Sequence, residues 1–313
     1  MPRRVAMLMV HTCPLEQAGI GDAGGMNIYV AESAARMAAQ GVEVDIFTRR
    51  DHLDLPAVVD LAPGVKVHHL DAGHDLQLTK EQVPAHFAEL SSELIKVLSG
   101  TRSYDLIHSH YWLSGKVAIP VAKELKLPLV HTMHTMARVK NLNLAESEVP
   151  EPMIRVQGET QIVAAADALT ANTDSEAASL VSLYGACPDI VRVVTPGVDL
   201  YNFTPGAGRT AARQVIGIDP NAQVITFVGR IQPHKGPELL IRATAEMLSH
   251  TPQLRTKLRV YIVGGASGSN SSEVERLKEL VSWLNITDVI SFSPPVPRAE
   301  LANWYRAADL ICV

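Results

Sequence analysis

Gly19-Ile-Gly-Asp-Ala-Gly-Gly-Met-Asn27 is the stretch of this sequence that most strongly predicts its fold. It follows an apolar run, residues 5–10, that has the character of a buried strand, and it precedes a helix-like run, residues 28–38. A glycine-dense turn lets the backbone approach a ligand closely, and the helix behind it presents free N–H groups and a partial positive charge. The stretch therefore predicts a strand–loop–helix unit whose loop accepts an anion, most simply a phosphate.

The same glycines also suggest an alternative. Gly19, Gly21 and Gly24 have the G-x-G-x-x-G spacing of dinucleotide-binding folds, and Asp45 lies about 20 residues further on, where such folds place a ribose-binding acid. The glycines come well after the strand end, however, rather than directly after it. The loop G-x-x-x-x-G-K-[ST] of nucleoside triphosphatases is absent. A dinucleotide-dependent oxidoreductase stays an alternative that NAD binding would test.

Length and composition limit the class of protein. A chain of 313 residues suits two domains of roughly 100–200 residues each. The net charge of -5 argues against a nucleic acid or an anionic membrane as the main partner. Cys13, Cys187 and Cys312 are scattered, which predicts a reducing compartment and no disulfide framework. With no apolar run near the roughly 20 residues of a membrane span, we expect a cytoplasmic protein without stable membrane insertion.

Short β-branched runs alternate with amphipathic segments, which is typical of a parallel sheet covered by helices on both faces. The candidate strands are residues 5–10, 42–48, 65–69, 106–108, 129–131, 168–171 and 190–194. The candidate helices between them are residues 28–38, 83–98, 116–125, 153–165 and 175–184. A Pro- and Gly-rich cluster, residues 195–206, then predicts a linker.

The alternation resumes after the linker. Candidate strands cover residues 224–228, 259–263 and 289–292, and candidate helices cover residues 236–248, 273–284 and 299–307. The sequence therefore predicts an α/β protein with two Rossmann-like domains, residues 1–203 and residues 204–313. Residues 309–313 look like the start of a further strand, so we expect the second domain to be incomplete in this chain.

Two cations mark the second half. Arg230 and Lys235 lie between a strand end and a helix start, where open α/β sheets bind ligands. Either cation alone is most simply explained as a solvated loop charge, but together on a glycine-flanked turn they predict a clamp for a diphosphate. The glycine- and hydroxyl-rich residues 263–272 follow the next strand and either approach the same ligand or form a plain loop.

Histidines gather in the first half. His108 and His110 follow one predicted strand, and His131 and His134 follow the next, so we expect all four to converge at one edge of the sheet. Their spacing does not specify the closed ligand set of a zinc site. We expect them instead to form hydrogen bonds with a polyhydroxyl substrate, since imidazoles offer donors and acceptors at fixed angles.

Several motifs resemble those of retaining glycosyltransferases with two Rossmann-like domains, the GT-B fold. They are Gly24-Gly-Met-Asn-Ile-Tyr-Val30, His108-Ser-His-Tyr-Trp-Leu113, Val194-Thr-Pro-Gly-Val-Asp199 and Phe227-Val-Gly-Arg230 with Lys235. Nearly from end to end, the chain is similar to the D-inositol-3-phosphate glycosyltransferases, which begin mycothiol biosynthesis. The more specific segments are residues 11–15, 21–27, 108–115 and 139–141.

The resemblance implies two sets of binding residues. The inositol phosphate acceptor would be held by His11, Asp22, Ala23, Gly24, Gly25, Met26, Asn27, Lys80, Tyr111, Thr135 and Arg155, of which Lys80, Tyr111, Thr135 and Arg155 surround the phosphate. The donor, UDP-N-acetylglucosamine, would be approached by Gln17, Ala18, Gly25, Arg230, Lys235 and the backbone of Val296. His134 would lie near the donor hexose and would form the catalytic set with Arg230 and Lys235. A magnesium ion would be associated with the carbonyl region of Tyr305, Arg306 and Ala308, with no role in the chemistry.

The resemblance also implies the reaction. N-acetylglucosamine would pass from UDP to 1D-myo-inositol 3-phosphate with retention of configuration, without a cofactor for the chemistry, in a homodimer. The related enzymes carry, beyond the length of this chain, an E-x7-E segment that contacts the donor, so we expect weak donor binding and doubtful turnover here. Two alternatives stay open: a transferase like sucrose-phosphate synthase that uses fructose 6-phosphate, and a sugar-phosphate-binding protein without turnover.

Overall fold

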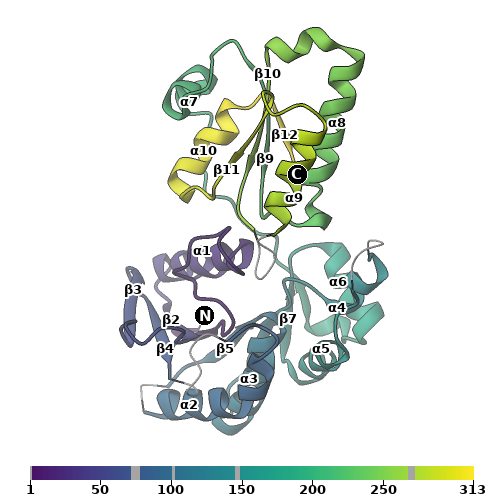
Figure 1. Cartoon of the computed structure of the whole chain (residues 1–313). Helices are drawn as coiled ribbons and strands as arrows, with labels where there is room; N and C mark the ends of the chain where they lie inside the picture. The colour runs from purple at the N-terminus through teal and green to yellow at the C-terminus, as the bar shows by residue number, and fades with distance from the viewer. Residues whose placement is uncertain (1, 72–77, 101–102, 145–148, 267–271) are drawn as a thin grey trace. The chain divides into compact units, whose positions relative to one another are not determined.

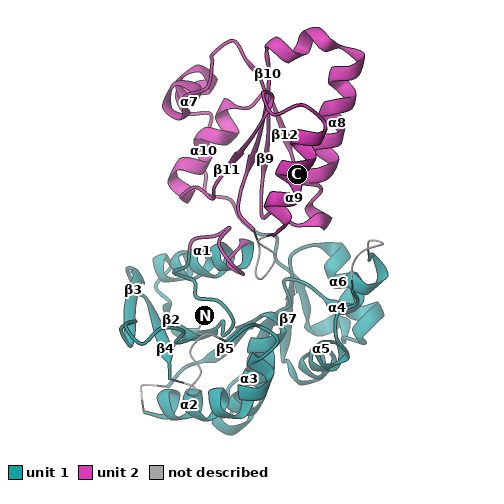
Figure 2. Cartoon of the chain, in the orientation of Figure 1, with its two compact units in different colours: residues 1–16, 25–196 teal, residues 17–24, 197–313 magenta. Residues whose placement is uncertain are grey.

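The structure, a computed structural model, describes residues 2–71, 78–100, 103–144, 149–266 and 272–313 (Figure 1). The chain divides into two compact units (Figure 2). Unit 1 comprises residues 1–16 and 25–196, and unit 2 comprises residues 17–24 and 197–313. Each unit is built of a mostly parallel sheet with helices, so the predicted α/β class is confirmed. The domain boundary predicted after residue 203 stays a prediction.

Unit 1 contains, in its described residues, an eight-stranded sheet of order β3-β4-β2-β1-β5-β6-β7-β8. The strands are β1 (Arg4–Leu8), β2 (Glu43–Arg49), β3 (Val58–Ala62), β4 (Val65–Leu70), β5 (Leu106–His110), β6 (Leu129–Thr132), β7 (Ala168–Ala171) and β8 (Val191–Val193). The edge strand β3 pairs antiparallel with β4, and the other neighbours pair parallel. Carboxyl ends of the parallel strands therefore meet along one edge, which is where such sheets bind ligands.

Helices cover both faces of this sheet. They are α1 (Gly25–Ala39), α2 (Phe87–Ser99), α3 (Tyr111–Leu125), α4 (Ala137–Leu142), α5 (Met153–Ala165) and α6 (Asp174–Tyr184), with the 3-10 turns η1 (Val83–His86) and η2 (Pro188–Ile190). Alternate residues of β1 enter two different cores, since side chains alternate along a strand. Val5 and Met7 pack with α1, whereas Ala6 and Leu8 pack with α2 and α3.

Unit 2 contains, among the residues described, a four-stranded parallel sheet of order β11-β10-β9-β12. The strands are β9 (Gln223–Val228), β10 (Leu258–Val263), β11 (Ile290–Ser293) and β12 (Leu310–Cys312). The helices are α7 (Gly208–Ile216), α8 (Pro237–His250), α9 (Ser272–Trp283) and α10 (Arg298–Ala307), with the turns η3 (Pro233–Lys235) and η4 (Pro252–Thr256). Helices α8 and α9 pack on the face that carries Phe227 and Ile262, and α7 and α10 pack on Val224.

The structure differs from the predicted elements in a few places. β3, α4 and α7 have no predicted counterpart. β3 and α4 have only five and six residues and so carry a weak periodic signal. Helix α7 has a clear amphipathic pattern, which the prediction missed. Helix α3 begins at Tyr111 rather than at residue 116. Ser and Gly are poor helix formers. The missing side chain of Gly115, however, lets α3 pack against Ile162 of α5, and this packing outweighs the low helix propensity. Residues 267–271 of the predicted glycine loop lie outside the described residues.

Candidate active site

The best-connected predicted site residue is Arg155 on α5. Its side chain is 4 % exposed, and its Nε donates to Glu159 Oε1 at 2.7 Å. Its Nη2 donates to the carbonyl oxygen (3.1 Å) and Oγ1 (2.9 Å) of Thr135, and its Nη1 lies 2.8 Å from Glu151 Oε2. Burial by itself lowers the pKa of Arg155, but the neighbouring Tyr111, Glu159 and Glu151 outweigh it and raise that pKa. The guanidinium is therefore a permanent, rigidly held positive charge.

Tyr111 joins Arg155 to His11. The guanidinium carbon of Arg155 lies 5.0 Å from the Tyr111 ring centroid, a cation–π distance, and the His11 ring lies 4.6 Å from that of Tyr111. Tyr111 adopts a left-handed backbone with φ 69°, an uncommon conformation for a bulky residue and one that gathers at functional sites. The structure thus brings together four predicted acceptor residues: His11, Tyr111, Thr135 and Arg155.

Lys80 is not joined to this cluster. It lies on an exposed segment after β4, and its ammonium nitrogen is 3.8 Å from Glu81 Oε1. A long, exposed side chain of this kind is free to turn toward an anion. Its predicted role at the phosphate stays a prediction.

The glycine loop belongs to unit 2. Within residues 17–24 the chain folds back on itself, with the amide of Gly19 donating to the carbonyl of Ala23 at 2.9 Å. Gly19 has φ 95°, which favours glycine. A Cβ on Gly24 would lie 3.4 Å from Arg230 Nε, so the missing side chain lets the arginine pack against the loop. Of the other loop residues, Gln17 is exposed, Ala18 and Asp22 are half-buried, and Ala23 is buried.

Unit 1 resumes at the start of α1. Gly25 is its first residue, and a Cβ there would meet open space. Met26 is half-buried against the core under α1. Asn27 is buried, and its Nδ2 donates to Thr12 Oγ1 and to the Cys13 carbonyl, both at 2.7 Å. Both amide hydrogens of Asn27 are therefore donated to the loop that follows β1 and hold it in place.

The predicted diphosphate clamp lies at the carboxyl end of β9. Arg230 comes just after the strand and is half-buried, and Lys235 ends η3 and is exposed. Gly236, with φ 74°, caps α8, so Lys235 lies directly before a helix N-terminus, which favours anions. Val296 is half-buried between β11 and α10.

The four histidines lie at or just after the carboxyl ends of β5 and β6, as predicted, but they are divided between the two faces of the sheet. His108 and His110 have ring centroids 4.1 Å apart, and Nδ1 of His110 lies 3.0 Å from Nε2 of His134. His131 instead pairs with Ser109 Oγ at 2.7 Å and faces Gly115 of α3. In the sheet register His131 is the partner of Ser109, so it points to the opposite face from His110.

Burial keeps these imidazoles uncharged. It lowers the pKa of His108 to about 4 and that of His134 to about 3, and it lowers those of His110 and His131 as well. His134 is therefore a neutral hydrogen-bonding group rather than an acid. Within the described residues, no three His, Cys, Asp or Glu side chains are grouped so that they could hold a metal ion.

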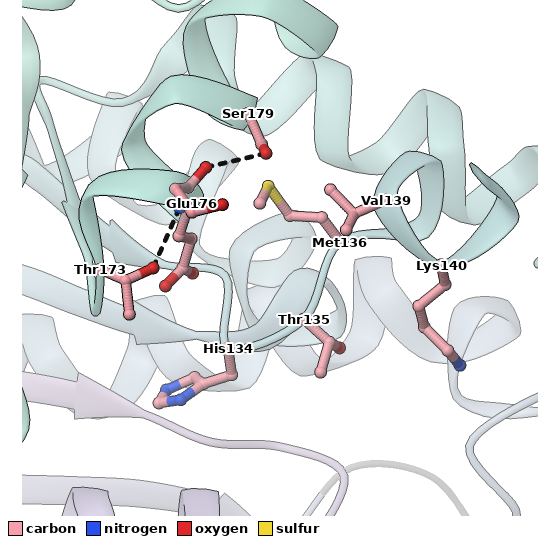
Figure 3. Close-up of a pocket in the computed structure, with 9 residues that line it drawn as sticks. His134, Thr135, Met136, Val139, Lys140, Thr173, Glu176 and Ser179 are labelled. Carbon is pink, nitrogen blue, oxygen red and sulfur yellow. Dashed lines mark hydrogen bonds between the residues drawn. The ribbon is translucent and has the colours of Figure 1, made fainter. Parts of the chain in front are cut away.

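His134 and Thr135 line a pocket of about 300 Å³ in unit 1 (Figure 3). Its other walls come from α4 and the start of α6, including Lys140 and Glu176. The carboxylate of Glu176 accepts from the amide of Asn172 at 2.7 Å, and burial raises its pKa. The pocket thus combines donors and acceptors on an apolar floor of Met136 and Val139, as small-molecule sites commonly do.

The predicted magnesium region is the end of α10. Tyr305 and Arg306 are in its last turn and Ala308 follows it, so carbonyl oxygens are available there. A cation already occupies this end: Arg213 donates to the Ala307 carbonyl at 2.9 Å and to Asp309 Oδ2 at 2.7 Å. Because that carboxylate is neutralised, the residues present fit a magnesium ion poorly.

Asp45 does not act as a ribose-binding acid. It lies in the middle of β2, 4 % exposed, and accepts from Arg4 Nη2 at 2.6 Å and from Tyr104 OH at 2.8 Å. Burial would raise its pKa, but His68, Tyr104 and Arg4 hold that pKa at about 2. The carboxylate is engaged in a buried network, which speaks against the ribose-binding role that the oxidoreductase alternative gave it.

Comparison with known proteins identifies the family to which the chain belongs. A family model described as "Glycosyl transferase 4-like domain" matches residues 24–197, and one described as "Glycosyl transferases group 1" matches residues 208–313. The D-inositol 3-phosphate glycosyltransferase of Kineococcus radiotolerans is 51% identical over 313 residues, covering 99% of this chain and 72% of that protein. The one from Streptomyces scabiei is 53% identical over 312 residues, covering 99% and 70%. The chain belongs to the D-inositol 3-phosphate glycosyltransferase family.

Solved structures agree on the architecture of this family member. Sucrose-phosphate synthase from Thermosynechococcus elongatus is 28% identical, with a TM-score of 0.87 over 99% of this chain and 74% of that one. Anabaena Alr3699/HepE, solved with UDP and glucose, is 17% identical with a TM-score of 0.70, covering 99% and 73%, and shows the fold alone. The predicted GT-B fold and glycosyltransferase activity are confirmed.

Some residues of the glycosyltransferase site were absent from the prediction. Glu159, Glu151 and Tyr29 hold predicted ligand residues in place, and the carboxylate of Glu159 also accepts from Tyr184 and from the amide of Ala137. Glu159 follows Arg155 at i+4 on a predicted helix, a spacing that indicates an ion pair. Tyr29 has no comparable signal, because its contact with His134 joins residues far apart in the sequence.

Among the described helices, none is both long enough and apolar enough to cross a bilayer.

Proposed function

We propose that this glycosyltransferase transfers N-acetylglucosamine from UDP-N-acetylglucosamine to 1D-myo-inositol 3-phosphate, with retention of configuration, as the first step of mycothiol biosynthesis. The observation that carries the proposal is the cluster of His11, Tyr111, Thr135 and Arg155, four residues matched to a phosphate-bearing acceptor. Family membership supports the same reading, since both relatives named above bear D-inositol 3-phosphate in their names.

The acceptor would be held through its phosphate. Arg155 is fixed by Glu159, Glu151 and Thr135 before any ligand arrives, so little conformational entropy is lost when the phosphate binds. The Tyr111 hydroxyl and the His11 ring supply further polar contacts beside it. Lys80 would turn in from its exposed segment and add the second positive charge that a phosphate monoester needs.

The donor would be activated by charge. When the sugar leaves, negative charge grows on the diphosphate, and positive groups placed there lower the barrier. Arg230, Lys235 and the N-terminus of α8 are these groups. His134, being neutral, would form a hydrogen bond with the hexose. No side chain is assigned as a nucleophile, so the acceptor hydroxyl would attack from the front face while a donor phosphate oxygen takes its proton.

The proposal includes no metal step. From the family resemblance we also propose a homodimer and a cytoplasmic location.

Titration calorimetry tests the acceptor first. We expect the full chain to bind 1D-myo-inositol 3-phosphate in preference to fructose 6-phosphate. Thr135→Ala should weaken that binding about tenfold, because Arg155 loses an oxygen that orients it. Arg192→Ala, at an exposed position on β8, is the matched control and should bind as the wild type does.

The opposite preference would overturn the acceptor assignment. Selective binding of fructose 6-phosphate would favour a reaction like that of sucrose-phosphate synthase, the 28% identical structure. Selective binding of inositol 3-phosphate without transfer from UDP-N-acetylglucosamine would favour a binding protein instead.

A further inference from the structure

A hydrogen bond joins His134, the residue proposed to contact the hexose, to a second histidine, His110, to which the proposed reaction assigns no role. His110 ends β5 and is fully buried, whereas His134 follows β6 and lines the pocket. Nδ1 of His110 and Nε2 of His134 are 3.0 Å apart. Because burial lowers the pKa of both imidazoles, that of His134 to about 3, both rings are neutral near pH 7.

Two neutral imidazoles can share this bond in only two ways, since each carries one N–H. In the first arrangement His110 Nδ1–H donates to His134 Nε2, and His134 carries its own proton on Nδ1. In the second, His134 Nε2–H donates to His110 Nδ1, and His110 carries its own proton on Nε2.

The surroundings of His110 decide between the two arrangements. Its Nε2 is buried and has no hydrogen-bond partner among the described residues. In the second arrangement this nitrogen would hold an N–H donor orphaned in the interior, and orphaned buried donors are rare in folded proteins. The first arrangement leaves only an unpaired acceptor there, and unpaired acceptors are tolerated more often.

The His134 ring is also held in place. Its backbone has φ 60°, and its ring meets the Tyr29 ring of α1 edge-on at a centroid distance of 5.1 Å. The bond to His110 occupies Nε2 of His134, so Nδ1 is the ring nitrogen that remains for another partner. His134 itself lines the pocket (Figure 3).

We propose that His110 is a positioning residue: it fixes the Nδ1–H tautomer of His134, so that His134 offers the occupant of the pocket a hydrogen-bond donor. The complementary group is an oxygen that accepts, namely a sugar hydroxyl, a carbonyl or a phosphoryl oxygen. That the occupant is a nucleotide sugar rests on the proposed function. The assignment of the His134 tautomer does not rest on the proposed function.

Nitrogen-15 NMR of the full chain, labelled at histidine, measures the tautomer directly. The His134 signals are identified by their loss in His134→Gln. We expect wild-type His134 to show a protonated Nδ1 and an unprotonated Nε2 at pH 7. A protonated Nε2 would overturn the proposal, and this result needs no variant of His110 to fold.

Two variants of His110 that have nearly the same shape then distinguish a positioning role of this residue from a packing role. His110→Asn keeps an N–H donor near the original Nδ1, whereas His110→Asp offers only acceptors and should move the His134 proton to Nε2. His131→Asn is the matched control, since His131 is equally buried but lies on the other face of the sheet, and it should leave the His134 signals unchanged. Identical His134 spectra in folded Asn and Asp variants would contradict the proposal.

Calorimetry with UDP-N-acetylglucosamine gives the consequence for binding. We expect His110→Asp to bind about tenfold more weakly than the wild type, because a donor contact is lost, and His110→Asn to recover most of that loss. Equal affinities of the two variants would remove the positioning role. If the wild type does not bind the nucleotide sugar at all, the proposed function fails while the NMR result still decides the tautomer.

Discussion

At the scale of single residues, this protein places its charged and polar site groups on supports that are themselves buried. Arg155 shares Glu159 with Tyr184 and the backbone of α4, so one fully buried carboxylate orients several parts of unit 1. Removing either member of such a pair leaves an uncompensated buried charge, which is strongly destabilising. The polar interior of unit 1 therefore connects ligand binding to stability.

The neutral histidines predict a dependence of stability on pH. Their native pKa lies below the unfolded value near 6.5, so unfolding takes up protons in acid and the stability present above about pH 6.5 is lost as the pH falls toward the native value. At pH 5 we expect the free energy of unfolding to have dropped by roughly 2 kcal/mol for each of His108 and His134. Denaturant unfolding at pH 7, 6 and 5 measures this.

The control for the pH series is His52→Asn, at an exposed position that should leave the slope unchanged. His108→Asn should make the slope shallower. A free energy of unfolding that stays constant from pH 7 to pH 5 would mean that the native and unfolded pKa values of these imidazoles are equal, so that burial does not lower them.

At the scale of elements, the site depends on close approach between helices and loops where a side chain is missing. A Cβ on Gly115 would lie 2.5 Å from Ile162 Cδ1 and 2.8 Å from His131 Cε1, so α3 sits against α5 only because residue 115 is glycine. A Cβ on Gly265 would lie 2.6 Å from the carbonyl oxygen of Gly19, so the glycine loop of unit 2 is packed in the same manner.

Gly115→Ala should lower the free energy of unfolding by about 1–3 kcal/mol, because the added methyl group overpacks a buried contact. Chemical denaturation measures the change. Adding Ile162→Val removes the Cδ1 atom that clashes and should recover part of the loss. Gly197→Ala, where a Cβ would meet nothing within 4 Å, should be near neutral; a similar loss at both glycines would show that helix packing is not the cause.

At the scale of the whole molecule, the chain has two separately packed units. Leu113 lies in a core of unit 1 and Ile262 in a core of unit 2, and both are fully buried. The segment of residues 17–24 is the exception to sequence order, because it packs with unit 2 although unit 1 flanks it on both sides.

Separate cores predict separate unfolding. In scanning calorimetry we expect two transitions, since chains with more than one domain commonly depart from two-state behaviour. Leu113→Ala should lower one transition and Ile262→Ala the other, each by about 2–5 kcal/mol of stability. A single transition that both substitutions shift equally would show that the units unfold together.

The sequence by itself determined the α/β class, most element positions and the family, because these depend on periodic hydrophobicity, glycine spacing and local motifs. The tertiary structure alone decided three features. His131 lies on the opposite face of the sheet from His110, and Asp45 accepts hydrogen bonds from Arg4 and Tyr104. Residues 17–24 pack with unit 2. The physical reason is common to all three. Strand register and burial bring together residues that are far apart in the chain, and a single sequence carries no local signal of such pairings.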